Sequence, residues 1–280
     1  MFKIIADSGA TKVDWRVVHP NGTIQQITTA GINPLFLSKD AICDILHREL
    51  RAAFEGDVGQ IHFYAAGITG AEMECYMQEC FQMVFPQAHC TADSDMVAAA
   101  RALCGNMPGI ACIMGTGSNS CFYDGEKILP DKVPAGGFIL GDEGGGAVLG
   151  RKLLSDFIKR MLPVEIDQAF KTQYPLIDIH YIIQKVYREP IPQRFLATFS
   201  PFIHEHRNHP HINDLLRTSF AEFFSRNVAQ YDYQRYPVHI VGSIACYYQD
   251  IITQEAQKQG MTMGKILKAP IDGLLTYHLS

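Results

Sequence analysis

Two stretches that lie far apart in the chain share one pattern, and this repetition limits the folds that the chain can adopt. FKIIADSGATKVDWRVVHPNGTI begins at Phe2, and IACIMGTGSNSCFYDGEKI begins at Ile110. Each contains a short apolar run, a tight turn with glycine, a second apolar run and an Asn-Gly or Asp-Gly pair, which favours a hairpin. Each stretch therefore predicts strand, tight turn, strand, hairpin turn and strand, and the duplication predicts two related halves.

Strands alternate with helical patterns along the chain, which predicts an α/β fold. In the first half, the spacing of Leu46, Leu50 and Phe54 places these side chains on one face of a helix. The second half becomes largely helical after GGFILGDEGGGAVLG, and one further strand, PVHIVG, precedes another helix. The helices expected there are RKLLSDFIKRML, DIHYIIQKVY, FLATFSPFIHEH, INDLLRTSFAEFFSRNVAQY and SIACYYQDIITQEAQKQG. We place one domain at 1–107, completed by a C-terminal helix at 270–280, and a second domain at 108–269.

The composition is that of an ordinary globular protein and argues against several classes of function. Hydrophobic residues make up 47% and charged residues 19% of the 280 residues, and the net charge of −5 comes without a Lys/Arg cluster. We therefore expect neither nucleic acid nor an anionic membrane as a partner. No apolar run suits a signal sequence or a membrane span, and the eight cysteines include no C-x-x-C pair. These features predict a cytoplasmic protein whose cysteines, such as Cys112 and Cys246 in apolar runs, are buried thiols.

The two tight turns are candidate phosphate sites. A strand that ends in a glycine-rich turn presents successive main-chain N–H groups, which favour anions. One such turn is weak evidence, but two, at 7–11 and 115–118, could hold one polyphosphate from both sides. Asp7 is suited to hold Mg²⁺ through its waters, and Thr11 and Lys12 add phosphate donors. No G-x-x-x-x-G-K-[ST] motif occurs, so a P-loop protein is excluded.

Taken together, six motifs resemble those of a known superfamily. DSGATKVDW, AAGITG, DSDMVAAARA, IMGTGSNS, GDEGGGAVLG and IVGSIA occur in the order seen in the sugar kinase/hsp70/actin ATPases. Within that superfamily the chain is most similar to the N-acetylglucosamine kinase and BadF/BadG/BcrA/BcrD ATPase branch, from residue 3 to the final helix. The resemblance implies two ribonuclease H-like, actin-like ATPase domains facing a nucleotide cleft, with extra helices in the second.

The resemblance also implies a nucleotide site built from three motifs, with ATP and Mg²⁺ as cofactors and Asp7 near the metal. From the residues alone, IVGS is equally an ordinary strand-to-helix turn. The residues that match the first phosphate loop, the second phosphate loop and the adenosine-side motif are, in that order, Asp7, Ser8, Gly9, Thr11 and Lys12; Gly115, Thr116 and Gly117; and Gly242, Ser243 and Ala245.

A general base for phosphoryl transfer should be a carboxylate at the end of a strand. CTADSDMVAAARAL offers Asp93 and Asp95. The family places its catalytic Asp directly before the helix, which favours Asp95, while Asp93 assists the site or solvates the turn. The alternative interpretation is that either acid is an N-cap carboxylate, which would explain one of them fully.

The resemblance places a sugar site around GDEGGG. Carboxylates accept paired hydrogen bonds from neighbouring sugar hydroxyls, and the glycines leave room for a ring, although Asp-Glu in such a loop is also typical of a solvated turn. The family's usual GGWG is replaced here by GGFIL, two positions shorter, which leaves the contact to the acyl group open. The residues assigned to the sugar are Asn33, Gly67, Thr69, Thr116, Asn119, Gly137, Asp142 and Glu143.

The function implied is ATP-dependent phosphorylation of an amino sugar, foremost N-acetylglucosamine at the 6-hydroxyl, by a homodimer. Glucosamine and N-acetylmuramic acid are alternative substrates. A BadF/BcrA-type ATPase that activates a partner enzyme is a second alternative, although no cysteine stands in the context where those activators hold an iron–sulfur cluster. A DNA-binding sugar sensor is not expected, because the chain starts on its first strand. The histidines of HEHRNHPH are expected in a solvated loop rather than a metal site.

Overall fold

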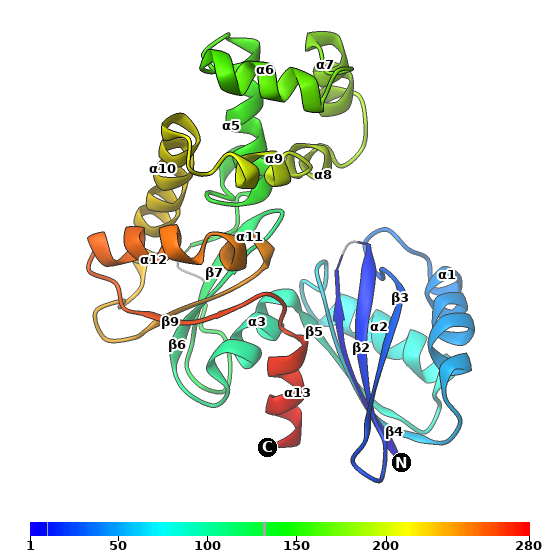
Figure 1. Cartoon of the computed structure of the whole chain (residues 1–280). Helices are drawn as coiled ribbons and strands as arrows, with labels where there is room; N and C mark the ends of the chain where they lie inside the picture. The colour runs from blue at the N-terminus through cyan, green and yellow to red at the C-terminus, as the bar shows by residue number, and fades with distance from the viewer. Residues whose placement is uncertain (10, 131–132) are drawn as a thin grey trace. The chain divides into compact units, whose positions relative to one another are not determined.

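The computed structural model describes residues 1–9, 11–130 and 133–280, and the chain divides into two compact units (Figure 1). Unit 1 comprises Met1–Met107, Gly125–Lys127 and Ala269–Ser280. Unit 2 comprises Pro108–Asp124 and Ile128–Lys268. Each unit has its own sheet and its own hydrophobic core, which confirms the predicted α/β architecture with two sheets.

Unit 1 is built on a five-stranded sheet with the order β3-β2-β1-β4-β5. The first three strands are antiparallel, whereas β1, β4 and β5 run parallel. A parallel strand at the centre of a sheet is covered on both faces, which explains the continuous apolar run at the start of β1. The elements are β1 (Phe2–Ser8), β2 (Lys12–Val18), β3 (Ile24–Ala30), α1 (Lys39–Ile45), η1 (Leu46–Leu50), η2 (Arg51–Ala53), β4 (Val58–Ala65), α2 (Ala71–Val84), β5 (His89–Ser94), α3 (Asp95–Cys104) and α13 (Ile271–Leu279).

The two faces of this sheet are covered by different helices. Ile4 packs with the cluster that includes Leu46 and Leu50, and neighbouring Ile5 points to the other face, because side chains alternate along a strand. That other face is covered by α3 and α13. Leu46, Leu50 and Phe54, which were predicted on one face of a helix, are all buried, although Phe54 lies just after η2. On α13, Asp272 accepts a hydrogen bond from the Arg16 guanidinium at 2.9 Å, so the end of the chain is part of unit 1.

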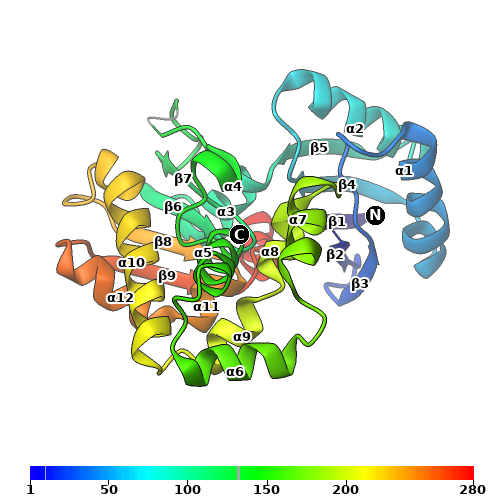
Figure 2. The ribbon, with the colours of Figure 1, turned by 90° about the horizontal axis from the view of Figure 1, so that it is seen from above.

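Unit 2 contains a four-stranded sheet with the order β7-β6-β8-β9, in which β6 and β7 are antiparallel and β6, β8 and β9 are parallel. Helices α10 and α12 lie side by side next to this sheet (Figure 2). The elements are β6 (Gly109–Met114), β7 (Ser118–Tyr123), α4 (Gly137–Leu140), α5 (Gly146–Ile158), α6 (Val164–Gln173), α7 (Ile179–Tyr187), α8 (Pro192–Ala197), α9 (Ser200–Glu205), α10 (Pro210–Arg226), η3 (Val228–Gln230), β8 (Val238–Val241), α11 (Ser243–Tyr247), α12 (Gln249–Lys258) and β9 (Met263–Leu267).

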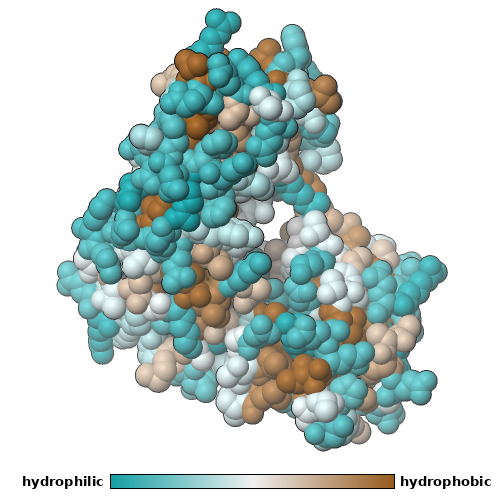
Figure 3. All heavy atoms as spheres, in the orientation of Figure 1, coloured by the Kyte–Doolittle hydropathy of each residue, from teal (hydrophilic) through white to brown (hydrophobic). Residues whose placement is uncertain are grey.

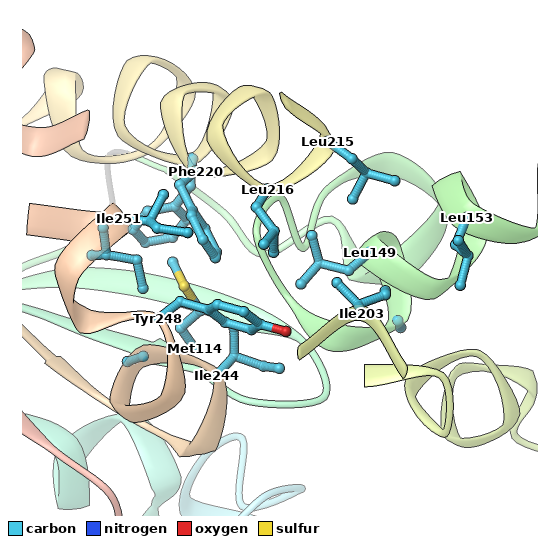
Figure 4. Close-up of a cluster of buried hydrophobic side chains, with 14 of the residues drawn as sticks. Met114, Leu149, Leu153, Ile203, Leu215, Leu216, Phe220, Ile244, Tyr248 and Ile251 are labelled. Carbon is cyan, nitrogen blue, oxygen red and sulfur yellow. The ribbon is translucent and has the colours of Figure 1, made fainter. Parts of the chain in front are cut away.

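The core of unit 2 joins the end of β6 to the surrounding helices. Figure 4 shows Leu149 from α5, together with Leu216 and Phe220 from α10, gathered around Met114 and Tyr248. These side chains are almost completely buried. The residue that precedes the second glycine loop, Met114, is therefore fixed by packing, and so is the start of that loop.

The structure departs from the predicted elements at several places. The strand expected at EKIL is only a bridge between Tyr123 and Ile128, and the predicted single helix FLATFSPFIHEH is two helices, α8 and α9. Pro201 lies in the first turn of α9; proline has no N–H to continue a helix but fits at a helix start. Strand β9 and helices α4 and α6 were not expected. Cys112 is buried as predicted, but Cys246 is exposed.

On the face seen in Figure 3, the surface of the unit 2 helices is mainly hydrophilic. Figure 3 shows brown, apolar side chains in separate patches among teal ones. Exposed apolar residues near α7 include Leu176, Ile183 and Tyr187. Among the described residues, no helix has both the length and the apolar character needed to cross a bilayer.

Candidate active site

Three carboxylates of unit 1 form one electrostatic group. Asp7, near the end of β1, lies directly opposite Asp14 on β2, so both side chains project from the same face of the sheet. Asp95 is the first residue of α3, directly after β5. Burial, followed by the negative charges of Asp14 and Asp95, raises the pKa of Asp7 to about 7, while Lys12 opposes the rise. A bound cation would relieve this repulsion.

Asp95 is oriented by the start of α3. Ser94 is the N-cap of this helix, and its side chain accepts a hydrogen bond from the Val97 N–H at 3.3 Å. The alternative that Asp93 or Asp95 is the N-cap is therefore wrong. Burial raises the pKa of Asp95, and hydrogen bonds from the main-chain N–H groups of Met96 and Asp95 itself oppose that rise. The result is a carboxylate that holds a proton more tightly than an exposed aspartate does.

Asp93 has a different environment. Its Oδ2 forms a 2.8 Å ion pair with Nη1 of Arg101, which also donates to the Tyr64 hydroxyl at 2.7 Å. Both charged side chains are largely buried. In the described part of the chain, Asp95 takes part in no ion pair. The structure therefore distinguishes the two candidate bases, because the charge of Asp93 is paired with that of Arg101 within unit 1.

The first predicted phosphate loop is closed by main-chain hydrogen bonds. The Gly9 N–H donates to the Lys12 carbonyl at 2.9 Å, and the Gly31 N–H donates to the Thr11 carbonyl at 3.1 Å. Thr11 and Lys12 are exposed, although Lys12 pairs with Asp14 at 2.8 Å. Ala10, inside the DSGAT motif, lies outside the described residues.

Ser8 differs from its predicted role as a phosphate ligand. Its hydroxyl donates to the Ile32 carbonyl at 2.7 Å and accepts from the Ile32 N–H at 3.2 Å. The side chain is also buried. Ser8 therefore fixes the loop that leads to Asn33 and does not present its hydroxyl to a ligand.

Two predicted sugar residues of unit 1 lie together. A Cβ placed on Gly67 would be 2.7 Å from Asn33 Oδ1, so the main chain at Gly67 directly contacts the Asn33 side chain. Asn33 Oδ1 also accepts a hydrogen bond from the Leu35 N–H at 3.0 Å, which holds the amide in place. Thr69 is exposed in the turn before α2.

The second glycine loop, residues 115–118, is packed onto the start of α5. The Gly146 N–H donates to the Gly115 carbonyl at 2.8 Å, and the Ala147 N–H donates to the Thr116 carbonyl at 2.9 Å. A Cβ on Gly145 would lie 2.8 Å from the carbonyl carbon of Gly117. The predicted room for a sugar ring at GDEGGG is therefore partly wrong, because glycine here permits contact between the loop and the helix.

The neighbouring acids Asp142 and Glu143 have different hydrogen-bond partners. Asp142 Oδ1 accepts a hydrogen bond from the Ser118 N–H at 3.1 Å, and burial raises its pKa. Glu143 is nearly buried, and its two carboxylate oxygens contact Arg226 Nε at 2.8 Å and Asn227 Nδ2 at 3.1 Å. The predicted contact of Glu143 with sugar hydroxyls is not supported, since its oxygens hold the end of α10. Asp142 stays beside the loop.

Two of the remaining predicted sugar residues of unit 2, Thr116 and Asn119, lie in or next to this loop in the sequence, and Gly137 does not. Asn119 Oδ1 accepts a hydrogen bond from the Ser120 N–H at 2.8 Å. Gly137 is exposed at the start of α4, and Thr116 is exposed at the tip of the glycine loop.

A cavity of about 610 Å³ in unit 2 joins two predicted nucleotide motifs. Gly115 and Thr116 line it from the glycine loop, and Ser243 lines it from the start of α11. Gly242, just before α11, has φ of 138°, and a Cβ there would lie 2.2 Å from the Met114 carbonyl oxygen. Gly242 is therefore required for α11 to approach the glycine loop so closely. Ala245, on α11, is fully buried in the core of unit 2.

Sequence reasoning missed residues in both units. In unit 1, Asp14 was missed, although a tight turn after Ser8 pairs position 7 with position 14. In unit 2, the missed cavity residues come mainly from α8, α9 and the end of α11. The HEHRNHPH histidines are also not simply in a solvated loop, because His204 lines the cavity while His209 and His211 contact Glu165 and Asp156. The missed cavity residues are Gly146, Ala197, Ser200, Pro201, His204, Glu205, Ile244, Tyr247 and Tyr248.

Comparison with solved structures finds similarity along the whole chain. A Porphyromonas gingivalis protein that is proposed to be an N-acetylglucosamine kinase is 39% identical, with a TM-score of 0.92 over 99% of this chain and 98% of that one. A Chromobacterium violaceum protein with the same proposed activity is 17% identical, with a TM-score of 0.75 over 99% and 98%. A ROK-family glucokinase from Streptomyces griseus, solved with glucose and AMPPNP, is 15% identical, with a TM-score of 0.57 over 98% and 97%. The last two show the fold. No family model and no curated protein sequence matches the chain.

Proposed function

This chain belongs to the N-acetylglucosamine kinase family of the sugar kinase/hsp70/actin superfamily, and we propose that it transfers the γ-phosphate of ATP to the 6-hydroxyl of N-acetylglucosamine. The chain is an ATP-dependent sugar kinase. The observation that carries the proposal of this particular sugar is the 39% identity over 99% of the chain to a protein proposed to act on it.

Unit 1 supplies the proton acceptor. Asp95 is a partly buried carboxylate that takes part in no ion pair among the described residues, and its raised pKa makes it a stronger base than an exposed aspartate. In the ionised form it would accept the proton of the sugar hydroxyl as the phosphoryl group is transferred. Asp93 would act as a positioning residue, because its pairing with Arg101 fixes the end of β5.

Asn33 and Gly67 would contact the sugar from unit 1. The contact between these two residues holds the polar Asn33 side chain in place. From unit 2, Asp142 and Asn119 would accept hydrogen bonds from the sugar hydroxyls or its amide. Asp142 remains beside the glycine loop through its bond from the Ser118 N–H.

Unit 2 supplies the nucleotide cavity. Its lining combines the glycine loop with Ser243 at the start of α11, and its volume of about 610 Å³ suits a nucleoside with part of its phosphate chain. Main-chain N–H groups around Thr116 would face the phosphates, and Gly9, Thr11 and Lys12 of unit 1 would add further donors.

The residues of unit 1 also fit a role for Mg²⁺. Asp7 and Asp14 offer carboxylate oxygens, which this ion prefers, and burial followed by the negative charges of Asp14 and Asp95 raises the pKa of Asp7. Among the described residues, no three His, Cys, Asp or Glu side chains form a metal cage. That fits an ion held by one carboxylate together with waters and phosphates. When bound, Mg²⁺ would neutralise charge on the transferring phosphoryl group.

A panel of acceptors tests the proposal. ADP release is measured with N-acetylglucosamine, glucosamine, N-acetylmannosamine, N-acetylmuramic acid, glucose and no sugar. We expect the highest kcat/KM with N-acetylglucosamine, and the position of the phosphate is read from the product by NMR. Equal ADP release with and without sugar would instead support an ATPase that activates a partner. Preference for another hexosamine would move the substrate assignment and leave the kinase reaction intact.

The assignment of the base has its own test. Asp95→Asn should lower kcat by roughly 10²–10⁴-fold, the usual contribution of a general base, with little change in the KM for ATP. Asp93→Asn is the matched control, since it should mainly lower stability by removing the negative charge that pairs with Arg101. A fully active Asp95→Asn enzyme would move the base elsewhere.

A further inference from the structure

Helix α9 brings two unusual polar atoms to the cavity of unit 2. Among the described residues, Ser200 Oγ and His204 Nδ1 are buried atoms that have no hydrogen-bond partner. The two residues are four positions apart on the helix, which places them on the same face, and both line the cavity. Buried polar atoms are nearly always satisfied, so a pair of unsatisfied ones on a cavity wall indicates that a ligand provides the partners.

The surroundings of these atoms favour a flat aromatic ligand. The His204 ring lies between Tyr247 and Tyr248, with ring centroids 5.2 Å and 5.4 Å away. Tyr248 is buried, whereas Tyr247 is half exposed and lines the cavity. The Arg207 guanidinium donates to the Tyr247 carbonyl at 3.0 Å and so fixes this end of α11. An aromatic ring that enters here can stack on tyrosine while its edge meets the histidine.

The Glu205 carboxylate indicates which end of the cavity suits an uncharged base and which end suits the phosphates. Glu205 lines the same wall as Ser200 and His204, and a carboxylate disfavours phosphate. Ile244, Ala197 and Pro201 add apolar surface. The phosphates therefore belong at the glycine loop, and the end of the cavity at α9 is left for the uncharged part of a nucleotide.

We propose that Ser200 and His204 recognise the edge of the nucleotide's purine base and set the preference for purine over pyrimidine nucleotides. This proposal rests on the proposed function, because it takes the cavity as the nucleotide site. A serine hydroxyl donates and accepts, and Nδ1 of a neutral histidine does either according to its tautomer. Together they match the neighbouring donor and acceptor on the six-membered ring edge of a purine. A smaller pyrimidine would leave at least one of the two atoms unsatisfied.

The chain offers a matched control for the serine. Ser219 Oγ is also buried without a partner among the described residues, but Ser219 lies within α10 and is not one of the residues that line the cavity. Ser219→Ala and Ser200→Ala remove the same hydroxyl from two unsatisfied sites. His204→Phe keeps an aromatic ring next to the two tyrosines, slightly larger than imidazole, and removes both ring nitrogen atoms.

The experiment measures ADP binding by calorimetry, without sugar, and kinase kinetics with ATP and with CTP. Ser200→Ala and His204→Phe should each weaken ADP binding and raise the KM for ATP by roughly tenfold, the effect of one lost hydrogen bond. Both should reduce the ratio of kcat/KM for ATP to that for CTP. Ser219→Ala should change neither quantity, and the KM for sugar should stay within about twofold in all three variants. Circular dichroism melting verifies that each variant is folded.

The outcomes separate this proposal from the proposed function. If the wild-type protein phosphorylates a sugar but Ser200→Ala and His204→Phe bind ADP like the wild type, base recognition by α9 is overturned and the kinase assignment stands. If ADP binding depends on both residues but no sugar is phosphorylated, base recognition stands and the sugar kinase proposal fails. An unchanged ATP-to-CTP ratio with weaker binding of both nucleotides would overturn the purine preference.

Discussion

Replacing Asp7 with asparagine should stabilise unit 1 at alkaline pH while reducing activity. Burial and the charges of Asp14 and Asp95 raise the pKa of Asp7 from 3.8 to about 7. Between these two values the folded protein keeps a proton that the unfolded chain has released, so the free energy of unfolding falls as pH rises through that window. The difference between the folded and unfolded pKa values of Asp7, 7 − 3.8 = 3.2, corresponds to a loss of about 4 kcal/mol in the free energy of unfolding. Asparagine has no charge to bury and avoids this loss.

The chain provides a specific probe for this measurement. Trp15 is its single tryptophan and is fully buried in unit 1, so urea unfolding followed by tryptophan fluorescence reports on that unit. With EDTA present, Asp7→Asn and the wild type should differ little at about pH 4 and by up to about 4 kcal/mol at about pH 8. Asp14→Asn should weaken the pH dependence without abolishing it, because burial is the largest cause. If the advantage of Asp7→Asn is the same at both pH values, a raised pKa of Asp7 is refuted.

Two further predictions concern glycine and the acidic pair of unit 2. Gly242→Ala should lower the stability of unit 2 by roughly 3 kcal/mol or more in thermal unfolding, because its Cβ would lie 2.2 Å from the Met114 carbonyl oxygen. Gly260→Ala, at a positive φ with nothing within 4 Å, should cost only about 1 kcal/mol, and an equal cost at both sites would contradict the close-packing argument. Asp142→Asn should raise the KM for sugar more than Glu143→Gln does, since Glu143 is held by Arg226 and Asn227. The opposite order in steady-state kinetics would restore the sugar contact originally predicted for Glu143.

The sequence predicts the first two strands of each repeat correctly, but it does not predict that the third strand is nearly lost in the second repeat. Both copies of the repeat give the expected first two strands, because an apolar run and a tight turn determine a hairpin locally. The third strand forms only in unit 1, where β3 pairs with β2 along its whole length. In unit 2 the equivalent segment has only the bridge at Ile128, and Pro130 follows shortly after in the sequence. Proline has no N–H to donate to a ladder, so Pro130 adds no donor to the pairing after this bridge.

The candidate site shows a similar limit. Glycine patterns located the loop at Thr116 and the turn at Ser243, because glycine is needed where main chains approach closely. The roles of Ser8 and Glu143 could not be predicted, since their hydrogen bonds go to Ile32 and to the end of α10, which are distant in sequence. His204 was missed for the same reason: the packing of α9 against α5, far from it in the sequence, brings it to the cavity.

The docking of α13 onto unit 1 sets an order for folding during synthesis. Strand β1 leaves the ribosome long before α13, and the face that carries Ile5 is covered only by α3 until Leu274 has emerged, after the whole of unit 2 has been made. The sheet of unit 1 is therefore made before unit 2 but is fully covered only after unit 2 has been made. Meanwhile, a nascent chain exposes an apolar sheet face that invites chaperones or incorrect pairing.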